Sequence, residues 1–267
     1  MTAAPPVNAD AEERLAATLP DLPLTFGLRS ILYRHVGSAW IDGDPGAPRS
    51  AVVVVPWAPT EPDVIGDDPQ SAWELLRHIP GWNCAHGSPA LVRALVPRVE
   101  EALRTTTLVQ EDVYYTLDQA PVPHQHPSVR PLTDDDVALL EEAPVPLRPV
   151  GFGSLLAALT GGVVAGAIVD GRVVSTVSMT VSSENYADLS AHTLEAWRRR
   201  GLGTAAACLA SRLVRARELT PVWSTVEDNR GSRRLAERLG YTEVGRRAYL
   251  VVPSLRRSSG FRPEPTA

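Results

Sequence analysis

The pattern R-x-x-G-x-G at residues 198–203 constrains this 267-residue chain most, because it joins a predicted strand to a predicted helix. Gly201 and Gly203 allow the backbone to turn tightly and to approach a ligand with no Cβ atom in the way. The first N–H groups of the following helix have no partner inside the helix, so together with the helix dipole they suit a pyrophosphate. Three arginines can add ion pairs to phosphate oxygens: Arg198, Arg199 and Arg200. A plain helix start beside a solvated arginine run remains the alternative for this segment.

The elements around this segment follow a regular order. Asp170 and Gly171 stand between two runs rich in β-branched residues, 163–169 and 172–181, which predicts a hairpin. A strand over 186–193 precedes the glycines, and an amphipathic helix follows them. The remaining predicted elements are a strand at 129–132, an acidic helix start at 133–136, a strand at 222–226, a helix capped by Asn229 and ended by Gly240, and a closing strand at 242–252.

This order resembles the GNAT superfamily of N-acetyltransferases, and residues 161–250 look like the GNAT acetyltransferases with a degenerate N-terminal half. The segments that carry the resemblance are 187–203, 219–223, 227–229 and 233–241. The resemblance implies an α/β (α+β) protein with a mixed, mostly antiparallel central sheet flanked by helices, in two tandem GNAT-like domains. A dinucleotide-binding Rossmann unit is excluded, because the third glycine is missing and the preceding elements form an antiparallel hairpin.

The resemblance also implies a site for acetyl-CoA as co-substrate, with no metal. Backbone amides of residues 199–204, including those of Leu202 and Thr204, would hold the coenzyme A pyrophosphate. Thr193 and Leu194 would pair with the pantetheine amides as another strand would. Asn229 and Ser232 would face the pantetheine arm, although Asn229 could equally serve as a helix cap alone.

Acetyl transfer needs a base, an oxyanion donor and a proton for the departing thiolate. His192 and Asp188 are evenly spaced on one predicted strand and therefore share a face, so we expect His192 to act as the base and Asp188 to act through water or to orient it. A packed, hydrogen-bonded histidine is the alternative. A backbone N–H near Leu194 could serve the oxyanion. Many family members carry a tyrosine general acid where this chain has Ala236, and four groups could replace it: Tyr241, Tyr249, Ser232 or water.

Composition and the position of a proline-rich segment indicate two ordered blocks. Residues 24–118 read as an N-terminal α/β domain, with strands at 38–41, 51–57 and 108–117, helices at 69–78 and 89–103, and a core built around tryptophans: Trp40, Trp57, Trp73 and Trp82. Residues 119–128 form a Pro-rich linker whose His124 and His126 lack further metal ligands. Residues 129–253 form the C-terminal acetyltransferase domain. The ends, 1–23 and 254–267, are expected to be flexible.

The bulk composition narrows the function classes. A net charge of -5 disfavours nucleic-acid binding. Binding of RNA or DNA through the arginines at residues 198–200 is therefore the third hypothesis, after an acetyltransferase and a sensor. Cys84 and Cys208 suggest neither a disulfide framework nor a zinc site, and no apolar run is long enough for a membrane span. We therefore expect a cytoplasmic protein, a monomer or homodimer, that acetylates an amine of a small molecule or peptide. A non-catalytic acyl-CoA sensor or interaction module is the alternative.

Overall fold

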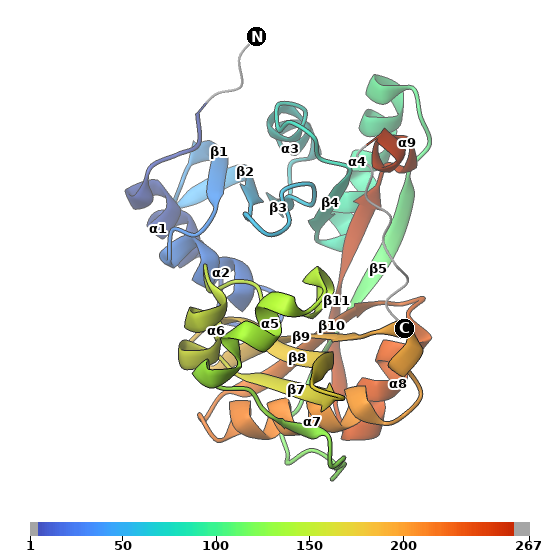
Figure 1. Cartoon of the computed structure of the whole chain (residues 1–267). Coiled ribbons are helices and arrows are strands. Elements are labelled where there is room, and N and C mark those ends of the chain that lie inside the picture. Colours follow the sequence, from blue (N-terminus) through green and yellow to red (C-terminus); the bar gives the residue numbers. More distant parts are fainter. Residues whose placement is uncertain (1–4, 259–267) are drawn as a thin grey trace. The chain divides into compact units, whose positions relative to one another are not determined.

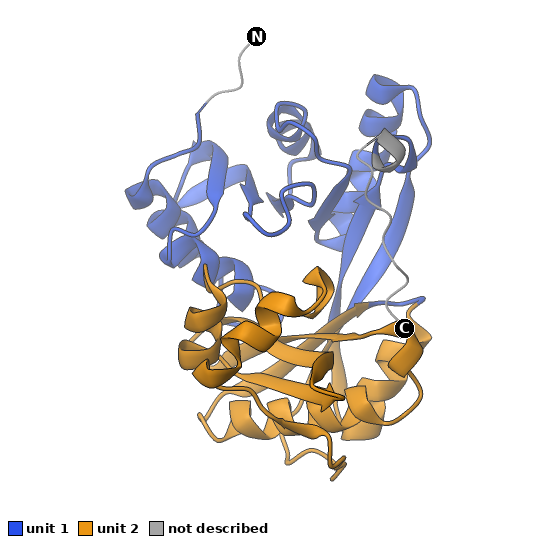
Figure 2. Ribbon diagram, in the orientation of Figure 1, with its two compact units in different colours: residues 1–113, 226–228, 245–265 blue, residues 114–225, 229–244, 266–267 orange. Residues whose placement is uncertain are grey.

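The computed structural model describes residues 5–258, with side chains for residues 5–255. The described chain divides into two compact units (Figure 2). Unit 1 holds residues 5–113, 226–228 and 245–258, and unit 2 holds residues 114–225 and 229–244. Both units are therefore discontinuous in sequence.

Unit 1 begins with helices and ends with the last strand and helix of the chain. Its helices are α1 (Ala9–Thr18), α2 (Phe26–Tyr33), α3 (Pro69–Leu76), α4 (Pro89–Leu103) and α9 (Pro253–Ser258). Its strands are β1 (Ser38–Asp44), β2 (Ala47–Val54), β3 (Asp63–Gly66) and β4 (Cys84–Gly87), joined by the first part of β5 (Leu108–Thr116) and most of β11 (Thr242–Val251). Trp73 and Trp82 meet edge to face in its core, 6.5 Å between ring centroids, as predicted for core tryptophans.

Three expectations for unit 1 are corrected. The N-terminal 23 residues are not simply flexible, because residues 9–18 form α1, Asn8 caps it and Leu15 is fully buried. The strands β3 and β4 were missed, since each has four residues and little alternation. The predicted boundary of the C-terminal domain at residue 253 is also wrong: residues 248–251 pair with β4 inside unit 1. The predicted tail at 254–267 overlaps α9 as far as Ser258 and otherwise lies outside the described residues.

Unit 2 follows the predicted order closely. Its strands are β6 (Val129–Pro131), β7 (Val164–Val169), β8 (Arg172–Ser182), β9 (Tyr186–Thr193) and β10 (Thr220–Val226), which lies beside β9. Its α-helices are α5 (Val137–Glu142), α6 (Leu155–Gly161), α7 (Leu202–Arg215) and α8 (Arg230–Leu239). Three short 3-10 helices complete it: η1 (Asp134–Asp136), η2 (Val145–Leu147) and η3 (Glu195–Trp197). The predicted hairpin is confirmed, because Asp170 and Gly171 both have positive φ, at 49° and 73°, as a primed turn requires. In Figure 1, α7 and α8 run along one side of these strands and α5 and α6 lie on the other.

The strands connect in the order β1-β2-β3-β4-β11-β5-β10-β9-β8-β7-β6. Two of the neighbouring pairs, β3 with β4 and β9 with β10, are parallel, while the hairpin-linked neighbours are antiparallel. The predicted mixed, mostly antiparallel sheet flanked by helices is thus confirmed. Within the described residues, no helix combines the length and the apolar character needed to cross a membrane.

Candidate active site

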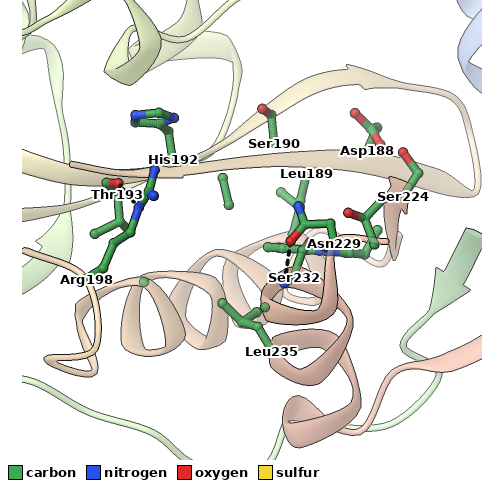
Figure 3. A pocket seen from close by; sticks show the side chains of 15 residues that line it. Asp188, Leu189, Ser190, His192, Thr193, Arg198, Ser224, Asn229, Ser232 and Leu235 are labelled. Carbon is green, nitrogen blue, oxygen red and sulfur yellow. Dashed lines mark hydrogen bonds between the residues drawn. The ribbon is translucent and has the colours of Figure 1, made fainter. Parts of the chain in front are cut away.

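A gap between β9 and β10 forms the centre of the site. Within the described chain the two parallel strands pair at three positions, from Tyr186 with Thr220 to Asp188 with Val222, and the pairing ends there. A cavity of about 260 Å³ lies where they part (Figure 3). Seven of the predicted site residues line it: Asp188, His192, Thr193, Arg198, Gly203, Asn229 and Ser232.

The alternation of β9 gives this cavity two different sides. Asp188, Ser190 and His192 point away from α7 and α8, whereas Leu189 and Thr193 point toward these helices (Figure 3). Asp188 and His192 therefore share a face, as predicted. They are four positions apart along the strand, which places their Cα atoms roughly 13 Å apart with Ser190 between them. Asp188 cannot orient the imidazole by direct contact, so that part of the prediction is wrong.

The N-terminus of α7 closes one end of the cavity. Gly201 adopts φ 80° at the N-cap, and the part of the chain that the structure describes supplies no side-chain cap there. The first helical bond runs from the N–H of Ala205 to the carbonyl of Gly201, so the N–H groups of Leu202, Gly203 and Thr204 lie ahead of it. Uncapped main-chain donors at the positive end of a 14-residue helix form a site that favours an anion.

Gly203 allows this helix start to approach β9. A Cβ atom at position 203 would lie 2.9 Å from Oγ1 of Thr193, closer than side-chain contacts allow. Oγ1 of Thr193 is in turn 2.7 Å from the hydroxyl of Ser175 on the neighbouring strand, which holds it in place. The glycine spacing thus serves both the turn at Gly201 and the close packing at Gly203.

The three arginines are not equivalent. Arg198 is half-buried, lines the cavity and donates from Nε to the carbonyl of Thr193 at 3.1 Å. Arg200 places its guanidinium 4.7 Å from the ring centroid of Trp197. Arg199 and Arg200 are exposed and do not line the cavity, so Arg198 is the arginine best placed for a bound anion.

The expected role of Leu194 is wrong. Its N–H donates to the carbonyl of Val174 at 3.0 Å, and its carbonyl accepts from the N–H of Trp197 at 2.8 Å. Because backbone groups alternate along an antiparallel strand, this bond to β8 turns the N–H groups of Thr193 and Ala191 toward the gap instead. Ala191 lines the cavity and was missed, since the phase of the ladder is not visible in the sequence of β9 alone.

The helix start at α8 supplies the opposite wall. Oδ1 of Asn229 accepts from the N–H of Ser232 at 3.1 Å, which confirms the cap. Oγ of Ser232 accepts from Nε1 of Trp223 at 2.9 Å, so the serine proton remains available for a bound group. Ala236, in place of the family tyrosine, is fully buried.

The two tyrosines considered as substitute acids lie elsewhere. The hydroxyl of Tyr241 is 2.8 Å from Oγ of Ser211 in the interior, and burial raises the pKa of this phenol far above its ordinary value. It does not line the cavity, so it is unsuited to donate a proton there. Tyr249 belongs to unit 1, where its ring stacks on His86 with 4.2 Å between centroids.

Asp188 is held at the point where the strands separate. Its carboxylate accepts a short hydrogen bond from the hydroxyl of Thr180 on β8. Neither Thr180 nor Ser224, which also lines the cavity, was predicted as part of the site. Both are hydroxyl residues inside strands, and the register of β8 with β9 is what brings Thr180 to Asp188.

Comparisons with known proteins agree with this architecture. A family model described as GNAT acetyltransferase matches residues 157–249. Among solved structures, the chain is similar to a GCN5-related N-acetyltransferase-like protein from Streptococcus suis 89/1591, with 21% identity, a TM-score of 0.69 and coverage of 91% of this chain and 99% of that chain. It is also similar to a GCN5-related N-acetyltransferase from Kribbella flavida, with 16% identity, a TM-score of 0.58 and coverage of 93% and 98%.

A third similar structure is a tandem GNAT protein from the clavulanic acid biosynthesis pathway, with 14% identity, a TM-score of 0.53 and coverage of 91% of this chain and 92% of that chain. No curated protein matches the chain significantly. At these identities the structural likenesses establish the fold, which is GNAT-like over nearly the whole chain.

Proposed function

We propose that this protein moves an acetyl group from acetyl-CoA to a primary amine of a small molecule or peptide by direct transfer, because residues 157–249 match a family model described as GNAT acetyltransferase. The observation that carries the proposal is the uncapped N-terminus of α7 at one end of the gap between β9 and β10. It offers main-chain donors for a diphosphate, and the gap beside it offers strand-edge donors and acceptors for an extended pantetheine arm.

Each part of the site has a role in this proposal. The N–H groups of Leu202, Gly203 and Thr204, with Arg198, bind the pyrophosphate. The gap-facing backbone groups of Thr193 and the carbonyl of Ala191 pair with the pantetheine amides.

The chemistry follows from the two faces of β9. The lone pair of the amine attacks the thioester carbon, the C–S bond breaks, and the sulfur leaves as thiolate. The N–H of Ala191 is oriented to stabilise the oxyanion, and His192 takes the proton from the amine, directly or through one water. The hydroxyl of Ser232, which lines the cavity, donates a hydrogen bond to the departing thiolate, and the thiolate takes its proton from water. A thiol with an ordinary pKa near 8.5 also leaves tolerably without help.

A sensor that binds acyl-CoA without turnover is the second candidate. The observation that favours it is the absence of a tyrosine from the described cavity lining, with Ala236 at the family position and Tyr241 buried elsewhere. A missing general acid slows transfer by roughly a hundred- to ten-thousand-fold without removing coenzyme binding.

The test begins with binding. Calorimetry with acetyl-CoA should show a saturable site in the wild-type protein, and Gly201→Glu should weaken it by at least about tenfold, because the added carboxylate faces the diphosphate and one lost ion contact alone is worth that much. Gly171→Glu is the matched control: both glycines have positive φ, at 80° and 73°, and open space in front of them. Wild-type protein with no affinity for acetyl-CoA or coenzyme A would refute the proposal.

Turnover separates the two candidates. Free thiol should appear from acetyl-CoA when a panel of primary amines is added, and mass spectrometry should find the acetylated amine. Saturable binding with no thiol release for any amine, including peptides with free N-termini, would favour the sensor.

A further inference from the structure

Six polar side chains occupy one face of β8 and β9 in two adjacent rows. Thr176 lies opposite His192 and Ser178 lies opposite Ser190 in the antiparallel register, so each pair shares a face. Thr180 joins Asp188 through its hydroxyl. The opposite face of the same strands is apolar where Val177 lies opposite Ala191 and Met179 lies opposite Leu189, and it is polar at Ser175 and Thr193.

An ordinary sheet with one solvent-exposed face would show the same alternation of polar and apolar residues, but here the polar side chains of β8 are buried. Thr176, Ser178 and Thr180 are 4%, 6% and 8% exposed, so the β8 row is interior rather than solvated. Buried hydroxyls cost free energy unless they are hydrogen-bonded, and apolar side chains would suit such positions better. A polar row in this place therefore calls for a reason beyond solubility.

Two of the buried hydroxyls support the neighbouring elements. Thr176 donates to the carbonyl of Leu147 in η2 at 2.9 Å, and Thr180 donates to Asp188. The side chains of the neighbouring β9 row are more accessible: Ser190 is exposed, and Asp188 and His192 are half-buried and line the cavity. A bound molecule on this side would meet a carboxylate, a hydroxyl and an imidazole in succession.

The charges of the cavity are separated along β9. Arg198 and the positive end of α7 lie near Thr193, whereas Asp188 lies five residues away, roughly 17 Å along the strand. One end of the cavity therefore attracts an anion and the other a cation. The volume of about 260 Å³ is at the small end for ligand pockets, which favours a small molecule over a folded protein.

We propose that the row Asp188, Ser190 and His192 recognises the acceptor, and that the acceptor is a small cationic amine that carries hydroxyl groups next to its amino group. This inference rests on the proposed acetyl transfer and names its acceptor class. Asp188 attracts the ammonium, Ser190 hydrogen-bonds an acceptor hydroxyl, and His192 takes the proton once the amine lies between them. An amine without hydroxyl groups would still place its ammonium by Asp188 but would leave the Ser190 hydroxyl without a matching group.

The test compares serinol with isopropylamine, which has the same carbon skeleton and lacks the two hydroxyls. We expect kcat/KM, expressed per free-base amine, to be at least about tenfold higher for serinol, since each neutral hydrogen bond contributes a factor of a few. Ser190→Ala should remove most of this preference by lowering the serinol value, with little change for isopropylamine. Thr242→Ala, an exposed strand hydroxyl outside the cavity, is the matched control and should keep the preference.

A binding readout keeps the inference separate from turnover. Calorimetry should show serinol binding to protein saturated with coenzyme A, and weaker binding to the Ser190→Ala variant. Serinol binding without thiol release would support the recognition row and contradict acetyl transfer. Equal or faster acetylation of isopropylamine would overturn the inference while leaving acetyl transfer intact. Failure of both amines to bind or react, with coenzyme A bound, would overturn it as well.

Discussion

At the scale of single residues, Asp188 is held in the cavity by a hydrogen bond from Thr180. Its partner Thr180 sits where β8 departs from regular pairing, between Met179 and Ser182. Gly151 packs against this irregularity so closely that a Cβ atom there would lie 1.9 Å from the carbonyl oxygen of Thr180. Only glycine fits, so the loop before α6 fixes the backbone that presents the Thr180 hydroxyl.

This arrangement makes Thr180 a positioning residue for Asp188. Thr180→Val removes the hydroxyl that holds the carboxylate in place. We expect KM for the amine to rise roughly tenfold in steady-state kinetics with kcat little changed, because a hydrogen bond to a charged group contributes about 1.5–3 kcal/mol.

Rescue distinguishes this role from general support of the fold. Thr180→Ser keeps the hydroxyl and should restore the wild-type KM in steady-state kinetics. A Thr180→Ser protein whose KM stays as high as that of Thr180→Val would show that Thr180 acts by packing alone.

At the scale of elements, the helices beside the cavity were predicted because the residue types at their ends commonly begin or end helices. Asn229 and Gly240 bound α8 as expected, and Gly201 begins α7. The hairpin before β9 follows from Asp170 and Gly171 in the same way. Such local signals act within a turn or two of the chain, so a single sequence is enough to read them.

What the sequence could not predict depends on pairing between distant segments. Leu194 was expected in the gap and Ala191 was not, because the ladder with β8 decides which backbone groups face outward. Thr180 reaches Asp188 through the same register. Arg198 lines the cavity and Arg199 does not, and Arg199 itself has a left-handed backbone, with φ 61°, that the sequence does not reveal. None of these follows from composition or periodicity.

Asn229 allows the two roles of the α8 start to be separated. Serine caps a helix as well as asparagine but lacks the amide NH₂ group. Asn229→Ser should therefore leave the melting temperature near that of the wild type and raise KM for acetyl-CoA several-fold, if the amide binds the pantetheine arm. Asn229→Ala should do both: lower stability by about 1 kcal/mol through loss of the cap and raise the same KM.

The control for this pair is the cap of α1, where Asn8 accepts from the N–H of Ala11 in unit 1. Asn8→Ala should affect stability without any change in KM, measured by thermal melting and steady-state kinetics. An Asn229→Ser protein with unchanged KM for acetyl-CoA would show that Asn229 acts only as a helix cap.

At the scale of the whole molecule, the path of the chain joins the two ends of the sequence in one unit. Unit 1 takes its core from residues near the start and from residues 245–252, with Ala248, Leu250 and Val252 fully buried against Val92 and Leu95. The last strand of the chain is therefore a structural part of the first unit. Substitutions late in the sequence should affect the stability of unit 1 rather than the coenzyme site alone.

Arg247 tests this expectation through an ion pair buried in unit 1. Its guanidinium donates to Oδ1 of Asp63 at 2.7 Å, with 13% and 17% of the two side chains exposed, and Nδ1 of His86 is 3.2 Å from the same oxygen. Burial alone would raise the pKa of Asp63, but the charge of Arg247 and the contacts of His86 outweigh it and hold the pKa below its ordinary value. The resulting stability is present above pH about 4 and is lost as the pH falls toward the folded-state pKa.

Arg247→Met should lower the free energy of unfolding by about 3–5 kcal/mol at pH 7, because it leaves a buried carboxylate without its partner. The deficit should shrink by up to about 1.4 kcal/mol per pH unit as the pH falls toward the folded-state pKa of wild-type Asp63, because the unfolded chain and the variant's Asp63 take up a proton while wild-type Asp63 stays ionised. Urea denaturation from pH 3 to pH 7 measures this. Arg14→Met removes an exposed pair with Asp44 and should change little at any pH. A deficit for Arg247→Met that stays constant from pH 7 to pH 3 would mean that the arginine stabilises unit 1 by packing and not through the charge of Asp63.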